Sequence, residues 1–477
     1  MTRPNILVLS TDQQRWDAIG ANGNEEIHTP NLNRLATEGI NFDRTFVQSP
    51  VCMPSRASYM TGRYPSQLRI YSNGISLPEH FRTLPEYFTN YGYETANIGK
   101  LHFLPHANRD HTEPHPTYGF DHLEISDEPG PYEDAYRAWV GKHAPDALDD
   151  ISIGLPPAAK TWQSVMGEDD IFHPDQRFSG EPEPFPAADD LTHTAFVGRR
   201  TIEYLEQDHE TPFLCVSGFY SPHQPWVVPQ RYLDLYDRDN LSIPELPSDL
   251  VEEREAIDGA SDHDGGVTFS EAERRGARHG YYAMVSEVDH WVGKILDALE
   301  RQGVLKNTIV VFMSDHGDDL GDHLRYGKGF PGWDPITRVP LIIRWPDGIA
   351  NPGRTVSGIT ELVDLLPTLL DASGIPVPSS LQGESLINVL GSESDTPKNC
   401  ALTESGSGKV LRTDRYRYAI EPNGNERLYD LEDDPKEYHN RINDSAYDSV
   451  VSDLRKMLMQ RITAIDIDGE RPRDWNY

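Results

Sequence analysis

Apolar residues recur along much of the chain in short continuous runs, each followed closely by polar and ionisable residues. The clearest runs hold four or five residues rich in Val, Ile, Leu and Phe, which is typical of strands buried on both faces of a sheet. They lie at 6–9, 213–216 and 309–313, and the segment 95–98 is a weaker strand candidate. The polar segments after these four lie at 10–13, 221–225, 314–317 and 99–102.

Helical segments separate these runs. Thr29 and Pro30 fit the N-cap and first position of one helix, and Gly39 fits its end. Further helices are predicted at about 283–299 and from Pro367 onward. Strands that alternate with helices predict an α/β fold, with a large, mostly parallel sheet between two helical layers. In such a sheet chemistry gathers beyond the carboxyl ends of the strands, where the polar segments lie.

The chain changes character twice. Residues 105–190 are rich in Pro, Asp, Glu and His with little periodicity, so we expect long loops over the site. Segments at 410–420 and 426–430 predict antiparallel strands, and a last amphipathic helix follows them. The chain therefore divides into a catalytic α/β domain over 1–380 and a small C-terminal α+β subdomain over 381–477. The apolar face of the last helix holds Val451, Leu454, Leu458 and Ile462.

The chain is strongly acidic, because it has 77 Asp and Glu residues but only 43 Lys and Arg residues, for a formal net charge of −34. This balance argues against nucleic-acid binding, which needs a basic surface. Acidity with scarce lysine is typical of salt-adapted proteins, and an ordinary acidic protein is the alternative. The apolar runs are too short to cross a bilayer, and no secretory signal is visible. We expect a cytoplasmic protein without membrane partners, with an exported form whose leader was removed as the alternative.

The most specific segment begins at Cys52 and reads Cys-Met-Pro-Ser-Arg-Ala-Ser-Tyr-Met-Thr-Gly-Arg. Pro54 fits the first turn of a helix and Gly62 its end, so Cys52 would lie at a helix N-terminus that favours an anion. Arg56 in the first turn would point to the same place. Spacing alone leaves two interpretations equally open, a site that attacks an anionic ester and an ordinary helix with a buried thiol.

This Cys-x-Pro-Ser-Arg segment, with Thr-Gly-Arg after it, resembles the signature of the type I, formylglycine-dependent sulfatases of the alkaline phosphatase superfamily. The resemblance extends from Asp12 to the stretch 428–435. It implies an alkaline phosphatase-like fold and a sulfuric ester hydrolase whose nucleophile is a formylglycine made from Cys52 by a formylglycine-generating enzyme. One hydroxyl of the hydrated aldehyde would attack sulfur, and the second would then expel sulfate. The expected substrate is a sulfated small molecule or carbohydrate, and many relatives act on carbohydrates.

The resemblance also implies one divalent cation, bound by two polar pairs and the formylglycine at Cys52. The pairs are Asp12-Gln13 and Asp315-His316, and each alone is more often a polar strand end than a ligand pair. Gln13 stands where the family usually has aspartate, and His316 where asparagine is frequent. Oxygen ligands favour Ca²⁺, whereas the imidazole keeps Mn²⁺ as the alternative. Asp315 is also the candidate base.

Further catalytic residues follow from the same resemblance. Lys100-Leu-His102 resembles the family's Lys-x-His element, and Lys328 resembles its later lysine. The two lysines would bind the non-bridging oxygens of the ester, although a solvated surface charge is the ordinary role of a single lysine. His223 or Lys328 would protonate or stabilise the leaving alcohol, while His102 and Arg56 would hold the diol.

Candidate substrate contacts are aromatic, arginine and histidine side chains near these motifs. Packing in the core or on the surface is the ordinary alternative for each of them. They are Arg69, Tyr71, Trp226, His323 and Trp333.

Two alternative functions remain at the level of sequence. A phosphonate monoester or phosphodiester hydrolase of the same superfamily is the closest, because its metal ligands resemble the Asp-Gln and Asp-His pairs. The element at Lys100 and His102 favours a sulfatase, because those relatives carry hydroxyl residues there. A silent binding protein on the same scaffold is a different class of function, and it requires that Cys52 is never oxidised.

Overall fold

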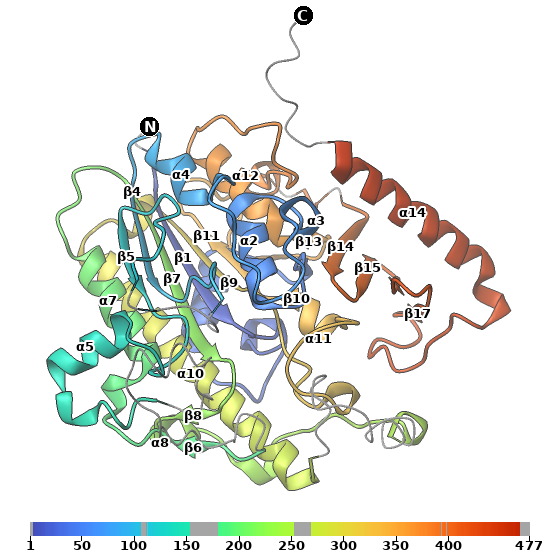
Figure 1. The fold of residues 1–477 in the computed structure, drawn as a ribbon, viewed down its shortest axis with the longest axis horizontal. Coiled ribbons are helices and arrows are strands. Elements are labelled where there is room, and N and C mark those ends of the chain that lie inside the picture. The colour runs from blue at the N-terminus through green and yellow to red at the C-terminus, as the bar shows by residue number, and fades with distance from the viewer. Residues whose placement is uncertain are drawn as a thin grey trace, which may run out of the picture.

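The protein is described by a computed structural model that covers residues 3–105, 111, 113–152, 180–251, 269–392, 394–396 and 398–467. A large sheet lies at its centre (Figure 1). It has eight strands in the order β12-β2-β11-β9-β1-β7-β4-β5. All of these strands run parallel except β11, which is antiparallel to β9 and β2. Their bounds are β1 (Asn5–Asp12), β2 (Ile40–Phe42), β4 (Glu94–Gly99), β5 (His122–Ile125), β7 (Phe213–Pro222), β9 (Thr308–Ser314), β11 (Leu341–Arg344) and β12 (Arg354–Val356).

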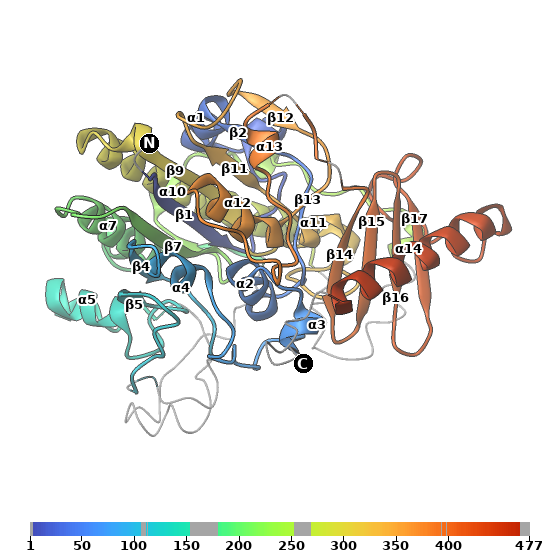
Figure 2. The same cartoon turned by 90° about the horizontal axis from the view of Figure 1, so that it is seen from above.

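Helices cover both faces of this sheet, as the sequence predicts (Figures 1 and 2). Successive residues of β1 enter opposite layers, since Ile6 and Val8 belong to one core and Leu7 and Leu9 to the other. The first core includes α2 (Cys52–Thr61), α3 (Pro65–Leu68), α4 (Leu84–Thr89), α12 (Leu365–Ala372) and α13 (Ile387–Leu390). The second includes α1 (Pro30–Glu38), α5 (Ala135–His143), α7 (His193–Leu205) and α10 (Glu271–Arg301).

Helix α10 is 31 residues long and packs against α7 and β7. A capping box begins it, because the Ser270 side chain accepts from the Glu273 N–H and the Glu273 carboxylate accepts from the Ser270 N–H at 2.7 Å. Its apolar residues alternate with charged ones along its length. Among the described helices, neither α10 nor any other is long and apolar enough to cross a bilayer.

The stretch predicted as long loops contains regular elements where the structure describes it. Strand β5 extends the sheet at its edge beside β4, and helix α5 follows it. The expectation for 105–190 was therefore wrong over this part, because β5 has only four half-buried residues and gives too short a pattern to recognise. Positions 106–110, 112 and 153–179 lie outside the described residues.

The C-terminal part forms a separate antiparallel sheet beside α3, as Figure 2 shows. Its order is β14-β15-β16-β17, with a packed last helix, which confirms the predicted α+β subdomain. The sequence pattern did not predict β14, and the boundary at 380 stays a prediction. The bounds are β14 (Cys400–Ser405), β15 (Gly408–Thr413), β16 (Tyr416–Ile420), β17 (Glu426–Asp430) and α14 (Asp448–Ile467).

Buried ion pairs join this sheet to the larger domain. Glu361, in the short strand β13 (Thr360–Glu361), binds Lys398 Nζ at 2.8 Å. Asp334, at the start of α11 (Asp334–Thr337), pairs with Arg412 at 3.0 Å and with Arg417 at 3.3 Å. Remaining short elements are β3 (Thr45–Phe46), β6 (Glu183–Pro184), β8 (Val227–Val228), α8 (Gln230–Leu233) and β10 (Arg338–Val339).

Candidate active site

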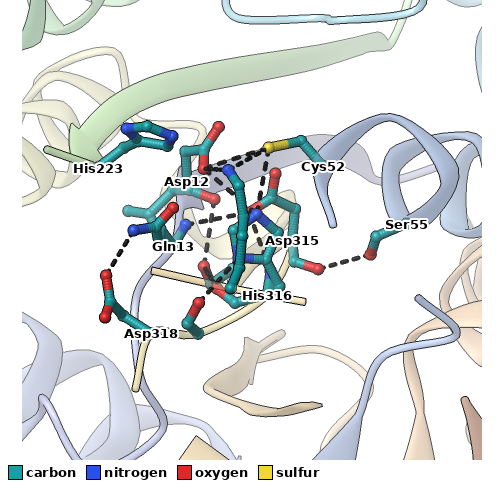
Figure 3. Close-up of polar contacts among 12 residues, drawn as sticks. Asp12, Gln13, Cys52, Ser55, His223, Asp315, His316 and Asp318 are labelled. Carbon is teal, nitrogen blue, oxygen red and sulfur yellow. Dashed lines mark hydrogen bonds and ion pairs between the residues drawn. The ribbon is translucent and has the colours of Figure 1, made fainter. Parts of the chain in front are cut away.

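The carboxyl ends of neighbouring parallel strands bring the predicted polar residues to one edge of the sheet (Figure 3). Asp12 is the last residue of β1, and Asp315 directly follows β9. Lys100 directly follows β4, and His223 directly follows β7. Because β9, β1, β7 and β4 are adjacent in that order, these side chains meet although they are far apart in the sequence.

Cys52 is the first residue of α2, a helix in which every residue is buried. Val51 before it is extended, and Gly62 ends the helix with a φ of 66° while its N–H donates to Ser58 O at 2.8 Å. The predicted helix is thus confirmed, with the thiol at its N-terminus. The helix dipole and the Arg56 side chain both favour an anion at this point.

Four donor groups surround a common point: Asp12, Cys52, Asp315 and His316. They are all buried, and one ligand atom of each lies within 4.8 Å of the others. His316 Nε2 lies 3.2 Å from Cys52 Sγ and 3.5 Å from Asp12 Oδ1. His316 Nδ1 donates to Gly317 O at 2.8 Å, so the Nε2 lone pair faces the donors. Two carboxylates and one imidazole in this arrangement fit a divalent cation.

The Gln13 amide is oriented so that its oxygen is available to the same site. Gln13 Nε2 donates to Asp318 Oδ2 at 2.5 Å and also to Gln224 Oε1. Gln13 Oε1 is buried and has no hydrogen-bond partner among the described residues. Burying an amide oxygen without a partner costs free energy unless a bound ligand interacts with that oxygen, so Gln13 fits the predicted role of a cation ligand.

Three cations neutralise the carboxylates, of which Lys100 and Arg56 are buried and Lys328 is 17% exposed. Lys100 Nζ lies 2.8 Å from Asp12 Oδ2, and Arg56 Nε lies 2.7 Å from Asp315 Oδ2. Lys328 Nζ lies 3.9 Å from Asp12 Oδ1. Burial alone would raise the pKa of Asp12, but the charge of Lys100, followed by that of Lys328, outweighs it and holds this pKa well below its usual value. Asp12 is therefore ionised and Lys100 protonated at neutral pH.

The Cys52 thiol is acidified in the same field. Burial and the Asp12 charge raise its pKa, whereas Lys328 and His316 lower it, and the net pKa lies below the usual value. Lys328 Nζ donates to Cys52 Sγ at 2.7 Å. Position 52 is thus the point at which a cationic side chain, a helix N-terminus and the metal-ligand cluster meet, which suits attack on an anionic ester.

Of the two predicted histidines, His223 lies beside this point, and His102 lies in the turn that follows β4. His223 Nδ1 donates to Gln224 O at 2.6 Å, and the ring lies near Asp12 and Gln13 in Figure 3. His102 is buried with a φ of 55°, and its backbone N–H donates to Asp127 Oδ1 at 2.7 Å. The Asp127 carboxylate therefore holds the turn that carries His102 in a conformation that is strained for a side-chain-bearing residue.

The predicted substrate contacts separate into distinct groups. Tyr71, His323 and Trp333 line a groove that also includes Lys328. His323 and Trp333 are almost completely buried, and their rings stack with 3.7 Å between centroids. They therefore stabilise the loop and have little surface left for a ligand. Trp226 packs in a core with α10 residues, and the exposed Arg69 caps α3. The substrate role of each of these five residues stays a prediction.

Sequence reasoning missed the residues that orient the predicted ligands. Asp318 and Gln224 fix the Gln13 amide, and Asp127 fixes the turn at His102. A signal existed for the first two, because Asp318 follows His316 closely and Gln224 follows His223 directly. Asp127 follows β5, which the sequence analysis did not predict.

Comparison with known proteins agrees with this geometry. The family described as sulfatase matches residues 4–375, and the one described as N-sulphoglucosamine sulphohydrolase, C-terminal, matches residues 321–464. The arylsulfatase of Clostridium perfringens is 32% identical over 96% of this chain and 94% of its own length. The N-acetylglucosamine-6-O-sulfatase of Bacteroides thetaiotaomicron is 29% identical over 96% of this chain and 86% of its own length.

A solved structure of the same fold is the phosphonate monoester hydrolase of Agrobacterium radiobacter. It has a TM-score of 0.80 and 26% identity, and the match covers 97% of this chain and 96% of that one. The family match spans most of the catalytic domain and includes Cys52, both cation-ligand pairs and both lysines. The chain thus belongs to the sulfatase family, as a sulfuric ester hydrolase with an alkaline phosphatase-like fold.

Proposed function

We propose that this sulfatase hydrolyses the sulfate ester of a carbohydrate, with a formylglycine made from Cys52 and one divalent cation, Ca²⁺ in preference to Mn²⁺. One observation carries the proposal: Cys52 Sγ lies at a buried helix N-terminus, within contact of Lys328 and of the cation-ligand cluster. A relative named as an N-acetylglucosamine-6-O-sulfatase supports a sugar sulfate. Maturation then needs a formylglycine-generating enzyme.

Hydrated formylglycine supplies a hydroxyl nucleophile and a second hydroxyl for sulfate release, and the cation supplies Lewis-acid polarisation. Lys100 and Lys328 bind the non-bridging ester oxygens, where negative charge must be balanced throughout the reaction. Arg56 holds Asp315 through the 2.7 Å contact and keeps it aimed at the nucleophile. His223 presents its Nε2 atom to the leaving oxygen, because Nδ1 is engaged with Gln224 O.

Phosphonate monoester hydrolysis is the second candidate, because one structural neighbour with that name has a TM-score of 0.80. The cation-ligand residues do not discriminate between the two reactions. The protonated Lys100 at the carboxyl end of β4, with His102 two residues later, favours the sulfatase.

The decisive experiment compares two leaving-group-matched substrates, 4-nitrophenyl sulfate and 4-nitrophenyl phenylphosphonate. The protein is co-expressed with a formylglycine-generating enzyme, and conversion of Cys52 is measured by mass spectrometry of the peptide that contains it. Each substrate is assayed with Ca²⁺, with Mn²⁺ and after chelation. Cys52→Ala is the control that lacks the nucleophile, and Cys215→Ala, a buried thiol in β7, is the matched control for loss of a cysteine.

We expect conversion of Cys52, sulfate release that requires it, and wild-type-like activity in Cys215→Ala. Greater kcat/KM for the phosphonate than for the sulfate would overturn the assignment in favour of the second candidate. Equal sulfate release by the converted and unconverted protein would exclude formylglycine as the nucleophile. A higher affinity for Mn²⁺ than for Ca²⁺ would reverse the metal preference alone.

A further inference from the structure

A groove of about 1090 Å³ lies between the catalytic domain and the C-terminal sheet. It begins at Lys328, the residue whose Nζ contacts Cys52 Sγ at 2.7 Å. The 328–333 loop, the 405–407 turn and Arg427 of β17 line it, and Phe330 of the loop lies against both Gly408 and Arg427. The groove is therefore the space into which the non-reacting part of an ester held at position 52 extends.

The walls combine aromatic rings with a fixed ion pair. Tyr71, Phe330 and Tyr438 are partly exposed on the groove. The Arg427 guanidinium lies 5.7 Å from the centroid of the Phe330 ring, and Arg427 Nη1 lies 2.5 Å from Glu421 Oε1. The Arg427 and Glu421 side chains both line the groove and keep 32% and 18% of their surface exposed, while Arg427 Nη1 itself is buried.

This wall is rigid because the two domains interlock there. Gly408 of β15 lies directly under the Phe330 ring, and a Cβ added at that glycine would come within 2.6 Å of the ring. Phe330 in turn supports Arg427. The position of the ion pair is thus set by the packing of the C-terminal sheet on the catalytic loop, which favours recognition of one particular ligand geometry.

The chemistry of the pair discriminates between classes of leaving group. A sugar hydroxyl donates and accepts at once, and the guanidinium and carboxylate side by side offer both a donor and an acceptor. An aryl group would displace water from the pair and offer no hydrogen bonds in place of those that the water made, which is costly. A second anionic group would be attracted by Arg427 but repelled by Glu421. Aromatic rings beside such a pair fit the apolar faces of sugar rings.

We propose that this groove binds a saccharide leaving group of at least two sugar rings, and that Arg427 with Glu421 determines this specificity through sugar hydroxyls. The volume of about 1090 Å³ lies at the upper end of the roughly 300–1,000 Å³ of pockets for drug-sized ligands and leaves room for two sugar rings. The inference rests on the proposed function, and it adds the size of the saccharide and two specificity residues outside the group of residues that contacts the ester.

The test compares a small leaving group with saccharides of increasing length. The probes are 4-nitrophenyl sulfate and size series (mono-, di- and tetrasaccharide) prepared from a sulfated galactan, a sulfated uronan and a glycosaminoglycan. Converted wild type is first ranked on all probes by sulfate release. Arg427→Met and Glu421→Gln are then compared with Arg455→Met, whose arginine pairs with Glu426 at an exposed position of the same subdomain.

We expect wild type to prefer a di- or tetrasaccharide to its matching monosaccharide by at least tenfold in kcat/KM. Arg427→Met should raise KM for that saccharide at least tenfold, and Glu421→Gln should also raise it. In both variants kcat/KM for 4-nitrophenyl sulfate should stay within twofold of wild type. Arg455→Met should match wild type on both. Thermal unfolding and the aryl sulfate activity show that each variant is folded.

Two results would overturn the inference while leaving the proposed function intact. They are equal use of monosaccharide and longer saccharide, and an equal loss on aryl and saccharide substrates in Arg427→Met. Hydrolysis of 4-nitrophenyl sulfate but of no saccharide would refute the carbohydrate substrate of the proposed function, and the inference with it. Absence of sulfate release from every probe by the converted protein would refute the proposed function as a whole.

Discussion

Lys100 carries one of the most completely buried positive charges in the described part of the chain, with 2% of its surface exposed. Burial alone would lower its pKa, but Asp12 at 2.8 Å outweighs this, so the pKa is raised and the charge is kept. Lys100→Ala should lower kcat by roughly 10²–10³-fold, since it removes a preorganised charge from the ester. Steady-state sulfate release measures this, with circular dichroism to verify folding. Lys306→Ala, at an exposed lysine, is the control, and turnover near wild type in Lys100→Ala would remove this residue from the mechanism.

Glu287 gives a pH-dependent stability that is separate from the active site. Burial raises its pKa to about 8, and its carboxyl contacts Thr192 Oγ1 at 2.5 Å. The folded state therefore binds a proton that the unfolded chain, with a glutamate pKa of about 4.3, has released. The free energy of unfolding should fall as pH rises from about 4.3 to about 8.

Glu287→Gln should remove this part of the pH dependence and unfold at higher urea concentration than wild type at pH 8. Urea unfolding at pH 5, 6.5 and 8 measures it. Other buried carboxyls with raised pKa values, such as Asp134 and Asp319, contribute the same sign, so the difference from wild type is the relevant quantity. Glu300→Gln, at an exposed position of α10, should keep the wild-type slope. An unchanged slope in Glu287→Gln would contradict the prediction.

At the scale of elements, strands β4 and β7 approach so closely at their carboxyl ends that only glycine fits. Gly218 O accepts from the Lys100 N–H at 2.8 Å, and a Cβ on Gly218 would lie 2.0 Å from Lys100 O. Gly218→Ala should therefore displace Lys100 and lower kcat by roughly 10²-fold, because misplacement by about 1 Å is sufficient for such a loss. It should also lower the melting temperature.

Gly141→Ala is the matched control for this change. Gly141 lies inside helix α5, and its added Cβ would meet no atom closer than 3.7 Å. Alanine should stabilise the helix by about 0.5–1 kcal/mol and leave kcat unchanged. Kinetics and thermal unfolding of both variants measure the contrast. Full activity in Gly218→Ala would show that β7 does not set the position of Lys100.

At the scale of the molecule, the attachment of the C-terminal sheet depends on a few buried charges. Asp334 pairs with Arg412 and with the fully buried Arg417. Asp334→Asn should lower the free energy of unfolding by about 3 kcal/mol, because it removes a charge partner that two buried guanidinium groups share and leaves Arg417 with Glu437 alone. Urea unfolding measures this loss. Glu206→Gln, which breaks an exposed pair with Arg301, should cost less than about 1 kcal/mol, and an equal loss in both variants would contradict the prediction.

The sequence predicted those parts of the molecule that local patterns specify. The strand ends at Asp12 and Asp315 stand out because an apolar run precedes each one, and Cys52 and Lys100 stand out through their motifs. The structure brings these residues together at adjacent strands. The loops expected after Lys100 were partly wrong, because a four-residue edge strand has no distinctive period.

Local patterns do not say which distant segments contact one another, even where, as for Asp318 and Gln224, the residues lie next to predicted site residues. Gln13 is oriented by Asp318, which lies 305 positions away, and by Gln224, which lies 211 positions away. The groove needs Phe330 and Arg427 to meet across two domains. Packing of the C-terminal sheet decides these contacts, and single-sequence periodicity contains no information on that packing.

Because α2 is buried, the proposed maturation depends on two competing rates, that of Cys52 oxidation and that of folding around it. In the folded chain Cys52 is 1% exposed, so an oxidising enzyme must act while the surrounding segment is still open. Closure needs β9, because Ser55 of α2 donates to Asp315 O, 260 positions later. At about 5–20 residues per second, synthesis of that stretch leaves roughly 10–50 s on the ribosome before the pocket can shut. The fraction of active enzyme should then depend on translation speed and on the amount of the oxidising enzyme. Molecules that fold before Cys52 is oxidised should remain inactive.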